Sequence, residues 1–136
     1  MRKQYHFWPT GDGAWDAWDV DRLIARSAGL PVEDVPLDAI WELDTPYWSL
    51  PGDGPSTVNQ LITHMRLVCD VDPGYPVILG SDGRVINGMH RIARAVLEGR
   101  GTIRAVRFRV HPEPDHHGCQ PDDLSYDDIP GRPGHP

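Results

Sequence analysis

The residues best suited to chemistry in this sequence form one short run, Asn87-Gly88-Met89-His90-Arg91. An apolar stretch ends just before this run, and a helical pattern of apolar residues begins within it. A glycine at such a junction lets the backbone turn sharply and lets a ligand approach closely. The first N–H groups of the following helix have no intrahelical partner and lie at the positive end of the helix dipole. The run therefore predicts a binding site for an anion such as phosphate.

The side chains of the run strengthen this prediction. Arg91 carries a planar fork of donors that matches phosphate or carboxylate, and His90 is able to donate a hydrogen bond or transfer a proton. We therefore expect Gly88, Met89, His90 and Arg91 to bind the phosphate, and we take His90 as a catalytic candidate as well. The alternative is an ordinary surface helix whose arginines are solvated or pair with nearby acids.

A second group of candidates lies upstream, in and after the segment Trp41-Glu42-Leu43-Asp44. Glu42 has the chemistry of a general base toward a substrate hydroxyl, and is the second catalytic candidate. The alternative is a solvated acid that follows a strand. Tyr47 and Trp48 stand in a loop rich in proline and glycine, where aromatic side chains often line ligand pockets. The residues expected to form the substrate pocket are Asp44, Tyr47, Trp48, Asn87 and Arg94.

Periodic patterns of apolar residues predict the elements that position these candidates. Helices are expected over 20–28, 57–70 and 89–98, with Asp19 and Ser56 as the N-caps of the first two. Strands are expected over 32–35, 75–79, 84–86 and 102–110, and residues 37–43 fit either a helical turn or a strand. The strand pair leads directly into the helix over 89–98, which places the candidate turn at the start of that helix.

The same patterns predict the buried faces of two helices and the fold class. The stripe expected on the helix over 57–70 is Val58, Leu61, Ile62, Met65, Val68 and Cys69. The helix over 89–98 is expected to bury Met89, Ile92, Ala93, Val96 and Leu97. Helices and strands in this order predict an α/β (α+β) fold in which a small mixed β-sheet packs with helices.

The length of 136 residues fits one domain. We expect residues 1–110 to form it, with an aromatic N-terminal arm, and residues 111–136 to form an acidic, proline-rich and mostly irregular C-terminal tail. The tail contains six acidic residues and one arginine, so it carries most of the net charge of −7. The aromatic arm is expected either to cover the pocket or to mediate a dimer, and the sequence favours neither.

The composition also excludes classes of function. A net charge of −7 lacks the basic surface that nonspecific DNA binding needs, so no DNA partner is expected. No apolar run reaches 18 residues and the N-terminus does not have a signal-peptide pattern, so we expect no membrane association and a cytoplasmic location. The two cysteines form no disulfide framework. The spacing of His111, His116, His117 and Cys119 matches no zinc pattern, so no metal ligands are assigned.

A resemblance to a known family adds to these expectations. The stretch Pro76–Ala95, in which Gly88-Met89-His90-Arg91 joins a strand pair to a helix, resembles the core of the ParB/sulfiredoxin-like superfamily. The segment Val35–Ile40 resembles the opening strand of the same domain, and the resemblance covers roughly residues 33–110. It implies the fold of that superfamily. It also implies that Gly88, His90 and Arg91 bind the phosphates of a nucleotide.

Members of the superfamily use that phosphate differently. Sulfiredoxins need a cysteine where this chain has Met89, and a thioether does not form the sulfur intermediate, so we exclude that activity. ParB proteins bind CTP and use a following helix-turn-helix domain for DNA, for which this sequence offers no room. Free serine kinases are most similar in layout, with an Asp-Gly-x-His-Arg-like turn and an upstream glutamate as base. Asn87 holds the place of that aspartate and does not ionise, although its carbonyl oxygen could still ligate Mg²⁺.

Together these observations predict a nucleotide- or phosphate-binding protein. With ATP or ADP and Mg²⁺ as cofactors, it would transfer a phosphoryl group to a small polar metabolite, with Glu42 as the base. The alternative, which Asn87 favours, is a non-catalytic module that senses a nucleotide or metabolite or binds a protein partner. A nuclease, which ParB-like domains also suggest, is disfavoured by the acidic charge.

Overall fold

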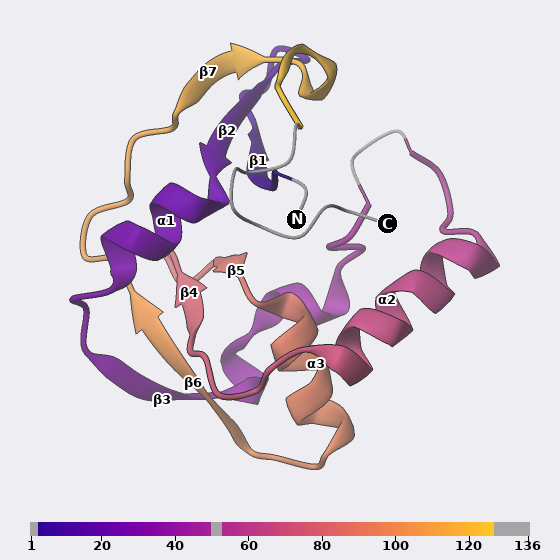
Figure 1. The fold of residues 1–136 in the computed structure, drawn as a ribbon, viewed down its shortest axis with the longest axis vertical. Coiled ribbons are helices and arrows are strands. Elements are labelled where there is room, and N and C mark those ends of the chain that lie inside the picture. Colours follow the sequence, from indigo (N-terminus) through magenta and orange to yellow (C-terminus); the bar gives the residue numbers. More distant parts are fainter. Residues whose placement is uncertain (1–2, 50–52, 127–136) are drawn as a thin grey trace. The chain divides into compact units, whose positions relative to one another are not determined.

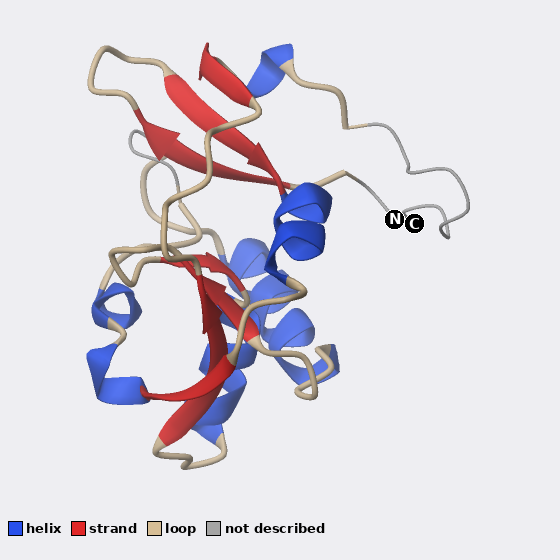
Figure 2. Ribbon diagram, turned by 90° about the vertical axis from the view of Figure 1, so that its left-hand side faces the viewer, coloured by secondary structure: helices blue, strands red, loops and turns tan. Residues whose placement is uncertain are grey.

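The computed structural model describes residues 3–49 and 53–126. Contacts along the chain divide it into two units. The central unit is Leu30–His111, and the terminal unit combines Met1–Gly29 with Pro112–Pro136. Every candidate site residue lies in the central unit. Figure 2 shows that strands and helices occur in both units.

A four-stranded sheet organises the central unit (Figure 1). Its strands are β3 (Val32–Pro36), β6 (Thr102–Arg107), β4 (Val77–Leu79) and β5 (Val85–Asn87), in the order β3-β6-β4-β5. β4 runs parallel to β6, with Ile78 opposite Val106, whereas the other two neighbouring pairs are antiparallel. The prediction of a small mixed sheet in an α+β unit is confirmed.

Two helices and two 3₁₀ turns complete the central unit. α2 (Val58–Asp70) and α3 (Met89–Leu97) lie side by side, and α3 contacts β4 and β6. The turns η1 (Leu37–Ala39) and η2 (Trp41–Asp44) show that the segment 37–43 takes the helical alternative. The core joins side chains from the sheet, from α3 and from the segment 35–40, namely Val35, Leu37, Ile40, Val77, Leu79, Val85, Met89, Ile92, Ala95 and Ala105.

The terminal unit contains a three-stranded sheet in the order β1-β2-β7. Its elements are β1 (Tyr5–Pro9), β2 (Trp15–Asp19), α1 (Val20–Ser27), β7 (His116–Cys119) and the 3₁₀ turn η3 (Pro121–Asp123). β7 pairs with β2, and Asp115 N–H donates to Ala17 O at 2.9 Å. The segment expected to be an irregular tail therefore contributes a strand, His116–Cys119, whose backbone completes the ladder of β2, and a 3₁₀ turn at Pro121–Asp123. Residues 127–136 lie outside the described residues.

This arrangement also differs from the predicted division at residue 110. Trp18 Nε1 donates to Pro112 O at 2.7 Å, and the Asp115 carboxylate accepts from Asp19 N–H and pairs with Arg22. These contacts attach residues 112–126 to the N-terminal segment. The aromatic arm thus packs with the C-terminal segment, a long-range pairing for which neither segment carries a local sequence signal.

The helix starts show how local sequence sets the elements. The Asp19 side chain accepts hydrogen bonds from Asp21 N and Arg22 N, so the predicted cap of α1 is confirmed. The cap of α2 is Thr57 and not Ser56, because Thr57 forms a reciprocal capping box with Gln60. β4 and β6 are shorter than the expected strands, and β5 is shifted by one residue.

The predicted apolar faces of α2 and α3 were only partly right. α3 buries Met89, Ile92 and Ala95, whereas Val96 and Leu97 are exposed. The buried face is centred on Ile92, and at 100° per residue Leu97 lies about 140° round the helix from it. Leu97 therefore points away from the core and is 78% exposed.

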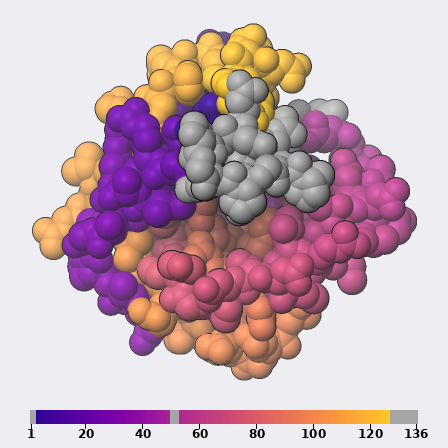
Figure 3. Space-filling model, in the orientation of Figure 1, coloured from indigo at the N-terminus to yellow at the C-terminus, as the bar shows by residue number. Residues whose placement is uncertain are grey.

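α2 departs further from its prediction. Of its expected stripe, only Val68 is buried. The members that are exposed are Val58, Leu61, Ile62, Met65 and Cys69. Periodicity records that a helix has an apolar face but not how much of that face finds a partner, and among the helices and strands α2 packs mainly on α3. The atoms of α2, magenta in Figure 3, form part of the molecular surface.

No helix within residues 3–49 and 53–126 has both the length and the apolar character needed to cross a membrane.

Candidate functional site

The turn between β5 and α3 has the backbone geometry that its sequence predicts. Gly88 is the N-cap of α3, with φ 111° and ψ 18°. This is a left-handed backbone conformation that residues other than glycine rarely adopt. A Cβ on this residue would lie 2.6 Å from Val77 Cγ1, inside the core. Glycine is therefore required here both by the backbone angle and by the packing. No side chain caps the first turn of α3, so its N–H groups keep the capacity to bind a ligand.

Arg91 is held beside this turn by neutral oxygens. Its Nη1 donates to Tyr75 O at 3.0 Å, and its Nη2 donates to Asn87 Oδ1 at 2.7 Å. Burial lowers the pKa of Arg91 from its ordinary value, although an arginine keeps its charge at neutral pH. Among the described residues, no carboxylate forms an ion pair with it. A half-buried positive charge thus stands at the start of α3; Asp72 interacts with it electrostatically, but no described carboxylate lies within ion-pair distance.

His90 projects from α3 onto a histidine of α2. His64 Nδ1 and His90 Nε2 lie 2.8 Å apart, and the two rings are inclined by 18° with centroids 5.1 Å apart. Because the two nitrogens are this close while the centroids are this far apart, the two rings meet edge to edge. Trp48 stacks on both imidazoles, at centroid distances of 4.2 and 4.7 Å and an angle of 12° to each.

The environment keeps both imidazoles neutral. Burial, together with the repulsion that a protonated His64 would exert, lowers the pKa of His90 to about 4, and burial also lowers the pKa of His64. A hydrogen bond between two ring nitrogens needs one donor and one acceptor, so two protonated rings do not form it. At neutral pH His90 therefore brings no positive charge to a phosphate. Its predicted catalytic and binding roles would have to be those of a neutral imidazole.

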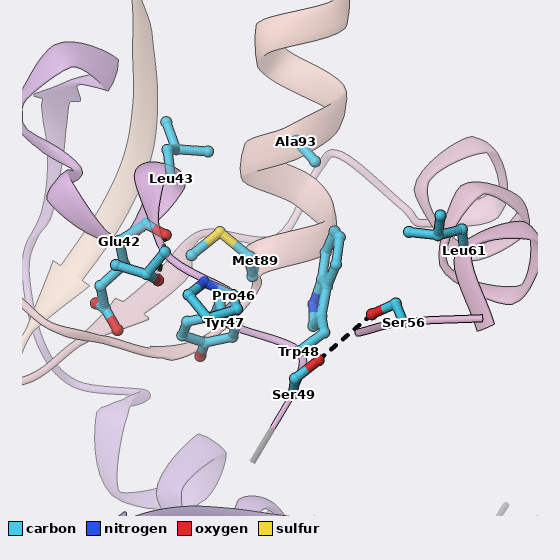
Figure 4. Close-up of a pocket in the computed structure, with 11 residues that line it drawn as sticks. Glu42, Leu43, Pro46, Tyr47, Trp48, Ser49, Ser56, Leu61, Met89 and Ala93 are labelled. Atoms are coloured by element: carbon cyan, nitrogen blue, oxygen red, sulfur yellow. Dashed lines mark hydrogen bonds between the residues drawn. The ribbon is translucent and has the colours of Figure 1, made fainter. Parts of the chain in front are cut away.

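A pocket of about 310 Å³ opens beside the same tryptophan (Figure 4). It is lined by the segment 42–49, by the region where α2 begins and by one face of α3. The lining residues are Glu42, Leu43, Thr45, Pro46, Tyr47, Trp48, Ser49, Ser56, Leu61, Met89 and Ala93. Most of these side chains are apolar or aromatic, as is typical of small-molecule sites. In Figure 4 the Trp48 ring stands between Met89 on one side and Leu61 and Ser56 on the other.

Glu42 has a structural role in the wall of this pocket. Its side chain is buried, and Oε1 accepts a hydrogen bond from Val85 N at 2.5 Å. The Tyr47 hydroxyl donates to Val85 O at 2.7 Å. β5 is an edge strand, so these two side chains satisfy backbone groups that have no partner strand on that side. Burial raises the pKa of both Glu42 and Tyr47.

The predicted site residues separate into two neighbouring groups. Four of them line the pocket, namely Glu42, Tyr47, Trp48 and Met89. The others that lie at the turn are Asn87, Gly88, His90 and Arg91. Met89, the first residue of α3, belongs to both groups.

Two predicted pocket residues lie elsewhere. Asp44 is exposed and does not line the pocket. Arg94 Nη1 donates to Cys69 O and Val71 O, so this side chain satisfies carbonyl groups at the end of α2. An arginine near the C-terminus of a helix is stabilising there, which explains its position without a ligand.

Sequence reasoning gave too little weight to His64 and missed Ser49 and Ser56. His64 lies off the apolar stripe expected for its helix, and no local pattern links it to His90, which follows 26 positions later. Ser49 and Ser56 flank the proline- and glycine-rich segment, and their hydroxyls lie 3.4 Å apart at the pocket. Two hydroxyls that flank such a loop were the available signal.

Within the described part of the chain, no three His, Cys, Asp or Glu side chains converge as a metal site would require. Comparisons with protein-family models, with curated proteins and with solved structures found no match to this chain.

Proposed function

We propose that the central unit binds a nucleoside phosphate, with ATP or ADP as the ligand and its phosphate at the turn Gly88–Arg91. The observation that carries the proposal is Arg91, a half-buried guanidinium at the uncapped start of α3 that pairs with two neutral oxygens and with no carboxylate of the described chain. These two hydrogen bonds use two of its five N–H donors, so three donors remain for a phosphate.

The backbone supplies the other half of the site. The N–H groups of the first turn of α3 lie at the positive end of the helix dipole, which favours a bound anion. The left-handed backbone of Gly88 and its close packing on Val77 fix the turn that starts this helix. We further propose that the central unit has the ParB/sulfiredoxin-like fold, which the turn and the mixed sheet support.

The side chains do not fit a magnesium site of their own at this turn. Asn87 Oδ1, the predicted Mg²⁺ ligand, accepts from the positively charged Arg91, and Glu42 Oε1 accepts from Val85 N. A cation beside the Arg91 guanidinium would be repelled. Any Mg²⁺ would therefore be bound by the phosphates of the nucleotide. Binding of the nucleotide is proposed not to depend on the metal.

Transfer of the phosphoryl group is a second candidate function, and Glu42 favours it. This carboxylate lines the pocket, and its raised pKa brings it closer to the range of a general base. Against this, one of its oxygens already holds β5 in place. The non-catalytic alternative, binding without turnover, does not require Glu42 to act both as a base and as the acceptor that holds β5. We therefore place nucleotide binding first and phosphotransfer second.

The test is a thermal-shift and calorimetry series with ADP, ATP and inorganic phosphate, each with Mg²⁺ and with EDTA. A ligand that binds the native state at a hundred times its Kd stabilises it by about 2.7 kcal/mol. We expect such stabilisation by ADP in both conditions. Arg91→Gln should weaken it at least tenfold, whereas Arg100→Gln, on an exposed arginine that pairs with Glu98, should leave it unchanged.

Two results decide between the candidates. Absence of binding by any phosphate compound to the wild-type protein would overturn the proposal. If ADP binds, incubation of ATP with small hydroxyl compounds tests transfer. Turnover that Glu42→Gln abolishes, with ADP affinity retained, would establish the phosphotransferase, and binding without turnover would leave the non-catalytic module.

A further inference from the structure

Trp48 is an aromatic wall with two different faces. Its ring is parallel within 12° to both His64 and His90, which together cover one face. Trp48 also lines the pocket, whereas neither histidine does. The face that the histidines leave uncovered is the one available for stacking by a ligand in the pocket. The side chain keeps 40% of its surface accessible, a large value for a tryptophan whose ring is already stacked.

The stack fixes the plane of this wall. His64 comes from α2 and His90 from α3, and the hydrogen bond between them joins two helices under one indole ring. A tryptophan held in this way does not need to be ordered when a ligand arrives, so less conformational entropy is lost on binding. A flat ring gains most from a flat, fixed wall, because offset stacking needs parallel planes.

The remaining lining residues offer apolar surface and hydroxyl groups, with Met89 on one side of the Trp48 ring and Leu61 and Ser56 on the other (Figure 4). Met89 and Ala93 stand one helical turn apart on α3 and provide a thioether and a methyl group, and Leu61 adds an aliphatic group from α2. Ser49 and Ser56 supply hydroxyls that donate and accept hydrogen bonds. Among the described residues that line the pocket there is no arginine or lysine, so these walls suit an uncharged ring better than a phosphate.

From this arrangement we infer that the pocket binds the heteroaromatic base of the nucleotide, stacked on the free face of Trp48. The inference rests on the proposed function and names the part of the ligand that the turn does not hold. Met89 connects the two subsites, because it is the first residue of α3 and also lines the pocket. Hydroxyls form hydrogen bonds with any base. The presence of a base is therefore expected to raise the affinity more than the choice of base does.

The experiment follows the methionine methyl groups by NMR in protein labelled with [methyl-¹³C]methionine. The chain has three methionines, so the spectrum is simple, and Met89→Leu identifies the signal of interest. Met65 is exposed, lies outside the pocket and is the internal control. The probes are ADP, adenosine, which has the ring without phosphate, and ribose 5-phosphate, which has phosphate without the ring.

We expect ADP and adenosine to shift the Met89 methyl signal through the ring current of the base, with no change at Met65, and ribose 5-phosphate to leave it nearly unshifted. ADP should bind at least tenfold more tightly than ribose 5-phosphate. Ala93→Leu fills the pocket, keeps a good helix former and leaves the Trp48 stack in place. Ala93→Leu should weaken the binding of ADP at least tenfold without altering the Kd of ribose 5-phosphate. Trp48→Leu should do the same, with Trp41→Leu, outside the pocket, as its control.

Each outcome bears on the inference separately from the proposed function. Equal affinity for ADP and ribose 5-phosphate, with adenosine leaving Met89 unshifted, would overturn the base subsite while the phosphate site stands. A Met89 shift with adenosine, but no binding of ribose 5-phosphate or inorganic phosphate, would support the ring pocket and contradict the phosphate site. If no probe binds, both proposals are wrong.

Discussion

His64 Nδ1 and His90 Nε2 lie 2.8 Å apart and connect α2 to α3 beneath the ring of Trp48. This contact matters for α2, whose only fully buried member is Val68. It also joins His90, a neutral imidazole within the turn proposed to bind phosphate, to a second neutral imidazole on α2.

The histidine pair predicts a pH dependence of stability. The pKa of His90 is about 4 in the folded protein, against about 6.5 in the unfolded chain. Between these values the unfolded state binds the proton and the folded state does not, so the free energy of unfolding falls as the pH is lowered from 6.5 toward 4. Above pH 6.5 the contribution of this group is fully present.

Urea unfolding between pH 4 and 7.5 measures this effect. His90→Gln should flatten the fall between pH 6.5 and 4, and His116→Gln, on an exposed histidine of the terminal unit, should retain it. An unchanged slope in His90→Gln would show that the pair does not titrate as its burial implies.

A second prediction concerns the glycine of the turn. Gly88→Ala forces a left-handed backbone on alanine and places its Cβ 2.6 Å from the buried Val77. Backbone strain of this kind costs about 1–3 kcal/mol, and the clash adds to it. Gly99→Ala is the matched control, since Gly99 has φ +72° but no atom within 4 Å of the added carbon. Chemical denaturation should show a larger loss for Gly88→Ala; equal losses would mean that Val77 yields without cost.

The third prediction separates the structural and chemical roles of Glu42. Glu42→Ala leaves the buried Val85 N–H without its acceptor, which costs about 1–3 kcal/mol. Glu42→Gln keeps a carbonyl oxygen for that N–H. Because burial raises the pKa of Glu42, the folded state favours its neutral form, so the glutamine variant should be at least as stable at pH 7 as the wild type. Comparison of unfolding midpoints at pH 7 checks this. A glutamine variant as unstable as Glu42→Ala would contradict it.

Many of the helices and strands could be predicted because their signals are local. The cap at Asp19, the helix that follows Gly88 and the strand pair before it all depend on residues adjacent in sequence. The candidates for the phosphate site, Gly88–Arg91, could be chosen from the sequence because they too are adjacent along the chain. α2 shows the limit of such reasoning, since its stripe predicted a buried face and most of that face has no partner.

The missed features depend on contacts between distant residues. Glu42 was expected as a possible base, but its bond to Val85 spans 43 positions and depends on β5 being an edge strand. Arg94 was predicted to line the pocket, whereas its guanidinium donates hydrogen bonds to carbonyl groups at the end of α2, more than 20 positions earlier in the chain. The pairing of β7 with β2 likewise joins opposite ends of the chain.

The most direct test of the central claim is a titration of ¹⁵N-labelled protein with ADP in the presence of EDTA, followed by amide NMR. The phosphate site predicts that the backbone amides of Met89, His90 and Arg91 shift most, that the Arg91 side-chain signal shifts with them, and that inorganic phosphate reproduces these changes at higher concentration. Shifts confined to other parts of the chain, or no shift at millimolar ADP, would show that the start of α3 is not an anion site.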